Sequence, residues 1–213
     1  MKTRSLWGSP PTRFYNFLRR VETEFLGEKL RFCILGCADG KFVLPLARKG
    51  YEVLAIDIDD IAINGGIKAG VDGDVYMPGL ISRLEAEGVS KLVSVVNTDF
   101  MHHVTSKKYH GVFTSGAINY SYNLRHPIGQ ILTKVKSYVK TGGFLYFDYM
   151  LPMESEHYGR ENYFIKGQLE EYFKTPEWEV IYDRVLPPLK ERAHVDKPVD
   201  HYHHWGHLLV KKL

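Results

Sequence analysis

Two glycines and an acid in the stretch CILGCADGKFVLPLARKGYEVLAIDID, residues 33–59, have types and a spacing that could do chemistry. Gly36 and Gly40 bracket the turn after a short apolar run, and glycine lets a ligand approach the backbone closely. The helical pattern that follows offers N–H groups and a positive dipole end. Asp57 closes the next apolar run, where a carboxylate can accept both hydroxyls of a ribose. Together these features indicate an adenosine-containing ligand.

The glycine turn also has a purely structural interpretation. Its spacing is Gly-x-x-x-Gly, without the third glycine of the dinucleotide fingerprint, so it could be an ordinary strand-to-helix turn beside a capping aspartate. Pro45 is tolerated only near the first turn of a helix, which places the predicted helix start near Lys41.

A second acidic position follows the apolar run that ends in NTDF. Asp99 could accept a hydrogen bond from an adenine amino group, and the Phe100 N–H could donate to a ring nitrogen. The aromatic ring could also pack on the base. The alternative is that Asp99 is a solvated loop residue, but its place at the end of an apolar strand favours the ligand interpretation.

The elements that position these residues are predicted from hydrophobic periodicity. A helix is expected from the Ser9-Pro10-Pro11 start to Gly27, because apolar residues recur there at helical spacing. Strands are expected at 31–36, 51–57, 92–99, 110–117 and 142–150, with helical or irregular segments between them. Continuous apolar strands that alternate with helices predict a doubly wound α/β fold with a mostly parallel sheet.

The end of the chain has a different pattern. A helix is expected at 166–174, and strand-like runs at 178–186 and 204–213 follow without a helix between them. The proline-rich connection is too short for a crossover helix, so these two strands are expected to form an antiparallel pair that closes the sheet.

Length and composition limit the possible classes of protein. With 213 residues and 44% hydrophobic residues, we expect one domain with a real core. The net charge of +3 comes without a long basic run, so nucleic acid is not the expected partner. No uncharged apolar run of about 18 residues occurs, so no membrane is expected either. Cys33 and Cys37 are the only cysteines, which favours a cytoplasmic protein and packing rather than redox roles. The sequence gives no indication of the oligomeric state.

Taken in order, the residues from about 30 to 150 resemble the class I S-adenosylmethionine-dependent methyltransferases, especially small single-domain enzymes acting on metabolites. The resemblance implies a Rossmann-like, seven-stranded sheet with an antiparallel last strand. It divides 1–213 into a helical cover (1–29), a cofactor-binding core (30–150) and an acceptor-side helix with the closing strands (151–213). It implies S-adenosylmethionine as cofactor, bound by Gly36, Cys37, Ala38, Gly40, Asp57, Ile58, Asp99, Phe100, Ser115 and Gly116. Two departures from the family pattern are Ile34, where an acid is common, and Ala38, where the family prefers glycine.

The acceptor is expected beyond the ends of the fourth and fifth strands. Asn119, Tyr120, Asp148 and Tyr149 are the candidate substrate-binding residues there. If the last strand is antiparallel, it begins at that same edge, and this brings the histidine-rich segment 194–207 towards the acceptor. In a strand, His201 and His203 share one face. We identify His201, His203 and Tyr120 as candidate catalytic groups for removing a proton from a small-molecule acceptor.

Other interpretations stay open. The histidine-rich segment could form a metal site of two imidazoles plus an aspartate, Asp196 or Asp200, or a solvated surface tract. No established metal-ligand spacing is matched, so no metal is assigned. For the whole chain, the alternatives are a nicotinamide-dependent reductase or epimerase and a non-catalytic, methyltransferase-like partner subunit. Against the reductase, no tyrosine is followed four positions later by lysine.

Overall fold

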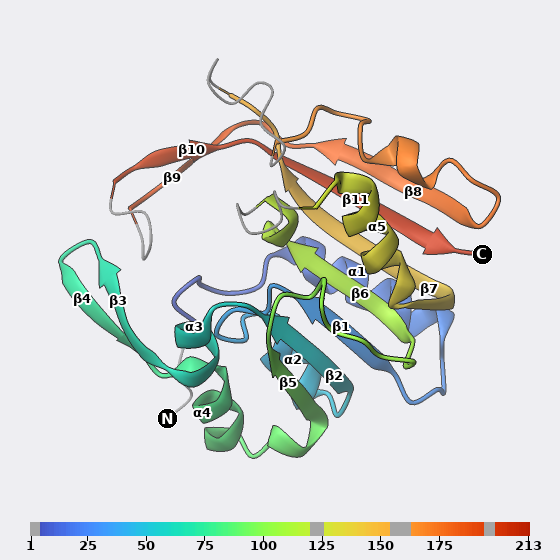
Figure 1. Ribbon diagram of the computed structural model, residues 1–213. Coiled ribbons are helices and arrows are strands. Elements are labelled where there is room, and N and C mark those ends of the chain that lie inside the picture. The colour runs from blue at the N-terminus through green and yellow to red at the C-terminus, as the bar shows by residue number, and fades with distance from the viewer. Residues whose placement is uncertain (1–4, 120–125, 154–162, 194–198) are drawn as a thin grey trace. The chain divides into compact units, whose positions relative to one another are not determined.

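The computed structural model describes residues 5–119, 126–153, 163–193 and 199–213. The chain forms two compact units, one of residues 1–103 and 191–201 and the other of residues 104–190 and 202–213. The sheet has seven strands in the order β5-β2-β1-β6-β7-β11-β8 (Figure 1). This confirms the predicted fold class.

The first unit contains the glycine turn and the helix that precedes it. Its helices and strands are α1 (Thr12–Glu24), β1 (Arg31–Leu35), α2 (Val43–Arg48), β2 (Glu52–Asp57), α3 (Asp60–Asn64), β3 (Gly66–Gly70), β4 (Gly73–Met77), α4 (Gly79–Ala86), η1 (Ser90–Leu92) and β5 (Val93–Asn97). Strands β1 and β2 pair in parallel, as do β2 and β5. Their carboxyl ends therefore meet at one edge, as the sequence predicted.

Helix α1 confirms the predicted N-terminal helix. It begins directly after Pro11 and buries one face, which includes Phe14 and Phe17. The Phe14 ring lies 5.1 Å from that of Phe42, just before α2, and the Phe17 ring lies 6.4 Å from that of Phe32 in β1. The apolar face at this spacing is therefore core packing within the first unit.

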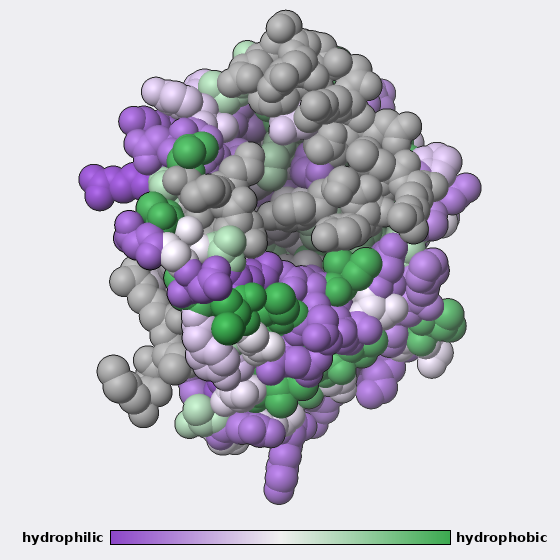
Figure 2. All heavy atoms as spheres, turned by 60° about the vertical axis from the view of Figure 1, so that its left-hand side comes forward, coloured by the Kyte–Doolittle hydropathy of each residue, from purple (hydrophilic) through white to green (hydrophobic). Residues whose placement is uncertain are grey.

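The connection from β2 to β5 is more elaborate than predicted. Between α3 and α4 the chain forms the antiparallel β3–β4 hairpin (Figure 1). Its side chains at Ile67 and Tyr76 are exposed. On the face drawn in Figure 2, hydrophilic side chains predominate and the hydrophobic ones form small separate groups.

The second unit supplies the remaining strands of the sheet. Its elements are β6 (Tyr109–Ser115), η2 (Ala117–Asn119), α5 (Ile128–Ser137), β7 (Val139–Met150), η5 (Glu170–Phe173), β8 (Trp178–Val185) and β11 (Trp205–Lys212). Strands β6 and β7 are parallel, and β11 lies antiparallel between β7 and β8. The predicted antiparallel closing pair is confirmed. A two-stranded sheet, β9 (Leu189–Glu191) with β10 (His201–His203), occupies the connection between β8 and β11.

Two predicted boundaries are wrong. Residues 166–174 form turns and the short 3₁₀ helix η5, because Gly167 has a φ of +83° and Pro176 follows closely. Strand β7 begins at Val139 rather than at Gly142, and its register with β6 shifts between Tyr109 and Gly111. Gly142 has a φ of +78°, which allows the strand to continue through an irregularity.

No helix among the described residues combines the length and the apolar character that crossing a bilayer would require.

We expect Gly206→Ala to destabilise the second unit. A Cβ at this position would lie 2.1 Å from Cζ of Tyr149, which is fully buried. Overpacking of this kind costs about 1–3 kcal/mol, measurable as a lower midpoint in urea unfolding. Gly129→Ala is the matched control, because a Cβ on that residue of α5 would lie 3.9 Å from Tyr172 and should stabilise the helix. Equal effects of both substitutions would contradict the packing argument.

Candidate functional site

The glycine turn is fixed by backbone hydrogen bonds to the neighbouring strand. The N–H groups of Gly36 and Cys37 both donate to the carbonyl of Ile56, at 2.9 and 3.1 Å. Gly40 has a φ of +92°, and a Cβ there would lie 2.6 Å from Cδ1 of Leu80. Glycine is therefore required at this position by both conformation and close packing.

Ala38 occupies the tip of this turn in the left-handed region, with a φ of +46°. Holding alanine there costs about 1 kcal/mol relative to a relaxed conformation. Its N–H donates to Oδ2 of Asp57 at 2.6 Å, so the turn is tied to the end of β2. The alanine that departs from the family pattern therefore adopts the conformation that glycine would favour.

The Asp57 carboxylate joins three parts of this edge. Besides the Ala38 bond, Oδ1 accepts from the N–H of Asp59 at 2.9 Å. Burial raises the pKa of Asp57, and the hydrogen bonds from Asp59 and Ala38 oppose that rise. Each carboxylate oxygen can accept more than one hydrogen bond, so both oxygens could also accept from a diol.

The end of β5 is attached to the end of β2. The Thr98 N–H and the Asn97 side-chain amide both donate to the Asp57 carbonyl, at 2.9 and 3.1 Å. One turn further, Oδ1 of Asp99 accepts from the Met101 N–H at 2.9 Å, and Phe100 is buried. The structure thus brings Asp57 and the Asp99 segment to one edge, as predicted.

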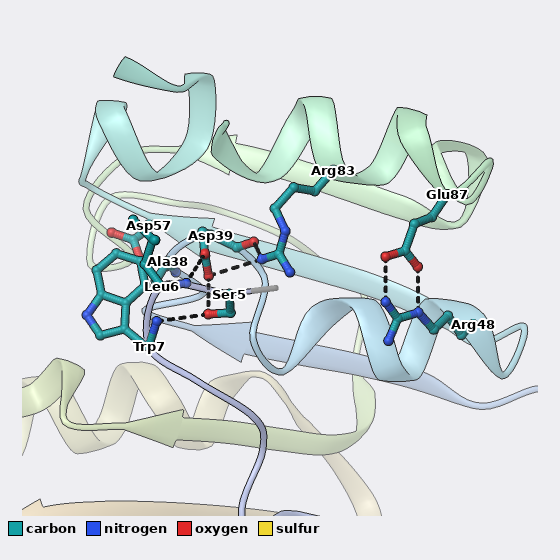
Figure 3. Close-up of polar contacts among 9 residues, drawn as sticks. All are labelled: Ser5, Leu6, Trp7, Ala38, Asp39, Arg48, Asp57, Arg83 and Glu87. Atoms are coloured by element: carbon teal, nitrogen blue, oxygen red, sulfur yellow. Dashed lines mark hydrogen bonds and ion pairs between the residues drawn. The ribbon is translucent and has the colours of Figure 1, made fainter. Parts of the chain in front are cut away.

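Asp39 is a buried acid of the glycine turn that sequence reasoning missed. It is buried, and its carboxylate accepts from Ser5 Oγ at 2.7 Å and from the Leu6 N–H at 2.9 Å (Figure 3). The buried guanidinium of Arg83 in α4 lies 3.2 Å from the same carboxylate and also donates to the Asp39 carbonyl. One carboxylate therefore ties the N-terminal segment and α4 to the glycine turn.

A second polar group lies beside the end of β2. Asp59 caps α3 by accepting from the Ala62 N–H, and its other oxygen accepts from Lys68 Nζ at 2.5 Å. The Lys68 ammonium lies 5.8 Å from the centre of the Trp7 ring. Lys68 therefore links Trp7, in the N-terminal segment, to the Asp59 carboxylate at the start of α3.

In the second unit, Asp148 accepts hydrogen bonds from three side chains, those of Ser115, Tyr146 and His207. Oδ2 accepts from Ser115 at 2.7 Å, and Oδ1 accepts from the Tyr146 hydroxyl at 2.7 Å and from Nδ1 of His207. Asp148 is fully buried and His207 nearly so. Since Ser115 and Asp148 pair directly between β6 and β7, strand register places these groups together.

Gly116 and Asn119 follow directly after β6. The Gly116 N–H donates to the Asp148 carbonyl at 3.1 Å, and Asn119 Oδ1 accepts from the Met150 N–H at 3.3 Å. Gly116 has a φ of +74°, and a Cβ there would lie 3.5 Å from the Trp205 ring. The ends of β6 and β7 and the start of β11 therefore lie together here.

The other candidates on the acceptor side differ in accessibility. Tyr149 is fully buried, and its hydroxyl donates to Asp183 at 2.6 Å. Burial and that hydrogen bond raise the pKa of Tyr149. Tyr120 lies outside the described residues. His201 and His203 are half-buried on β10, and the His203 ring lies 5.3 Å from that of Trp205.

The two cysteines are both buried, and neither forms a disulfide. Burial raises the pKa of each thiol, which disfavours the reactive thiolate.

Comparison with known proteins gives structural neighbours alone, since neither a family model nor a curated protein matches the sequence. TehB from Haemophilus influenzae has a TM-score of 0.64 and 16% identity, with 92% of this chain and 62% of TehB covered. The chain thus spans under two thirds of TehB. Magnesium protoporphyrin IX methyltransferase from Synechocystis PCC 6803, solved with bound SAM, has a TM-score of 0.63 and 11% identity, with 99% and 89% covered.

A methyltransferase from Thiobacillus denitrificans in complex with S-adenosyl-L-homocysteine has a TM-score of 0.61 and 14% identity, with 100% of this chain and 94% of the other covered. The chain therefore has the fold of the class I S-adenosylmethionine-dependent methyltransferases.

We expect Asp39→Ala to lower the free energy of unfolding by about 3–5 kcal/mol, because it leaves the buried Arg83 charge without its carboxylate. Urea unfolding checks the value. Glu171→Ala is the control, since it removes an exposed ion pair with Lys174 and should cost less than about 1 kcal/mol. Similar losses for the two variants would show that the buried pair has no special role.

Proposed function

We propose that this protein is an S-adenosylmethionine-dependent methyltransferase that acts on a small-molecule acceptor in the cytoplasm. The observation that carries the proposal is the Asp57 carboxylate, held at the end of β2 by the N–H groups of Ala38 and Asp59. Its position beside a glycine turn suits a ribose diol. Solved structures of the same fold contain SAM or S-adenosylhomocysteine, which supports this cofactor.

The proposed cofactor site lies along the edge of the first unit. Asp57 would accept from the ribose hydroxyls, and Asp99 with the Phe100 N–H would bind the adenine edge. Ile58 and Phe100 supply apolar surface for the base. The turn from Gly36 to Gly40, with Cys37 and Ala38, would border the methionine part. We assign Ser115 and Gly116 to the same moiety.

Bound S-adenosylmethionine supplies an electrophilic methyl group on a sulfonium. The protein then has to hold the acceptor in line with that methyl and exclude water. For this we propose Asn119 and Tyr120, which follow β6, together with Asp148 and Tyr149 near the end of β7. A small-molecule acceptor is supported by a neighbour of the same fold, a 1,6-didemethyltoxoflavin N1-methyltransferase solved with its acceptor.

Proton removal, where the acceptor requires it, needs a group with an available lone pair. The sequence offers His201, His203 and Tyr120. In His201, Nδ1 lies 2.9 Å from the Val199 carbonyl, so Nδ1 carries the hydrogen and Nε2 carries the lone pair. That lone pair could take a proton or bind a cation, and the two roles exclude each other.

We expect Asp57→Ala to weaken S-adenosylhomocysteine binding at least about tenfold, because a hydrogen bond to a charged group contributes about 1.5–3 kcal/mol. Calorimetric titration measures the dissociation constant. Asp59→Ala is the control, since Asp59 caps α3 and binds Lys68 without a proposed ligand contact.

A ribose-modified ligand separates direct contact from loss of turn structure. An analogue without the ribose hydroxyls should bind the unaltered protein weakly and should lose little further affinity in the Asp57→Ala variant. An equal loss for both ligands would show that Asp57 acts through the turn alone.

Cofactor affinity should also fall at acidic pH. Burial raises the pKa of Asp57, so its carboxylate becomes protonated at a higher pH than an ordinary aspartate. The ribose hydroxyls need the ionised form, so affinity is full above this raised pKa and is lost as the pH falls through it. Dissociation constants measured across a pH series test this. The same decline in Asp57→Asn would assign it to another group.

A further inference from the structure

The segment Ser5–Trp7 supplies a hydrogen bond to each oxygen of the Asp39 carboxylate. Ser5 Oγ donates to Oδ1 at 2.7 Å, and the Leu6 N–H donates to Oδ2 at 2.9 Å (Figure 3). The Trp7 N–H donates to Ser5 Oγ at 3.2 Å, which leaves the hydroxyl hydrogen directed to Asp39. Ser5 and Asp39 are both buried. One short segment therefore holds this carboxylate in a fixed orientation.

The position of Asp39 determines the conformation of its neighbour in the glycine turn. Ala38 has a φ of +46°, and such a conformation persists only where the surroundings over-determine it. The Ala38 N–H donates to Oδ2 of Asp57 at 2.6 Å. Any relaxation of the turn at Asp39 would therefore move the N–H group that orients the Asp57 carboxylate.

Release of the Ser5–Trp7 segment would take two donors away from Asp39. A buried carboxylate that loses hydrogen bonds is stabilised by turning towards water. The Arg83 guanidinium of α4, 3.2 Å from the same carboxylate, would still neutralise its charge. The first unit should therefore stay folded, while Ala38 becomes free to leave its strained conformation.

We propose that Ser5 is a positioning residue for the cofactor site. By binding Asp39, the Ser5–Trp7 segment holds Ala38 in place and thereby orients Asp57 before the ligand binds. The inference rests on the proposed function, because there Asp57 is the group assigned to the ribose. Docking of the segment and binding of the cofactor then favour each other, and thermodynamic linkage requires the same factor in both directions.

Amide hydrogen exchange in the ligand-free, full-length protein tests the control of the turn. We expect Ser5→Ala to speed exchange of the Ala38 N–H at least about fivefold, the lower end of ordinary coupling between sites. The amide of Leu54, in the middle of β2, is the reference and should exchange at an unchanged rate. Ser9→Ala, at an exposed position shortly after the segment, is the control variant and should leave both rates unchanged.

Two exchange results would overturn the inference. An Ala38 amide that exchanges equally fast with and without the Ser5 hydroxyl would show that the segment does not hold the turn. Equal acceleration of the Ala38 and Leu54 amides would show that Ser5 contributes to global stability alone.

Calorimetry with S-adenosylhomocysteine tests the link to the ligand. Ser5→Ala should raise the dissociation constant at least about fivefold, and Ser9→Ala should leave it unchanged. In the unaltered protein, bound S-adenosylhomocysteine should slow exchange of the Leu6 amide, which donates to Asp39. This measurement does not depend on any variant folding. A Leu6 amide that bound ligand does not protect would contradict the coupling.

The two sets of measurements separate this inference from the proposed function. If S-adenosylhomocysteine does not bind the unaltered protein, the proposed function is wrong, and the Ala38 exchange rates still support or refute the control of the turn by Ser5. If the ligand binds and Ser5→Ala leaves its dissociation constant unchanged, the positioning role is wrong, whereas the assignment of Asp57 to the ribose stands.

Discussion

The buried carboxylate of Asp39 imposes the constraint on which the first unit's site depends. A charge removed from water must be matched by donors, and here these come from Ser5, Leu6 and Arg83. Because the acid lies inside the glycine turn, satisfying its charge also fixes the turn against α4 and the N-terminal segment. The turn can therefore hold Ala38 in a strained conformation, because its surroundings leave it little alternative.

The same turn is held from its other side by Asp57. Each oxygen of this carboxylate accepts one backbone hydrogen bond, from Ala38 or from Asp59. These bonds set its orientation before any ligand binds. A pre-oriented acceptor loses less entropy on binding than a free side chain would. The same placement removes the carboxylate from water, and this desolvation raises the pKa of Asp57. The Asp57 carboxylate thus both stabilises the turn and makes the proposed ribose contact.

Local patterns were sufficient to predict these strands and the sheet edge where Asp57 and the Asp99 segment meet. Apolar runs with acids at their ends located β1, β2 and β5, and parallel pairing then required Asp57 and the Asp99 segment to meet. The β3–β4 hairpin was not predicted, since its short strands are largely exposed and carry no continuous apolar run. The expected helix at 166–174 failed because Gly167 and Pro176 outweigh helical spacing over so short a segment.

The residues that sequence reasoning missed are those whose partners lie far away in the sequence. Asp39 and Arg83 are 44 positions apart, and nothing local marks either as half of a buried pair. Strand alternation did place His201 and His203 on one face, since it depends on spacing within a single strand. It could not reveal the Asp39–Arg83 pair, because the packing of α4 against the glycine turn leaves no mark in local spacing. A buried pair between distant segments therefore becomes visible only once the fold brings its two partners together.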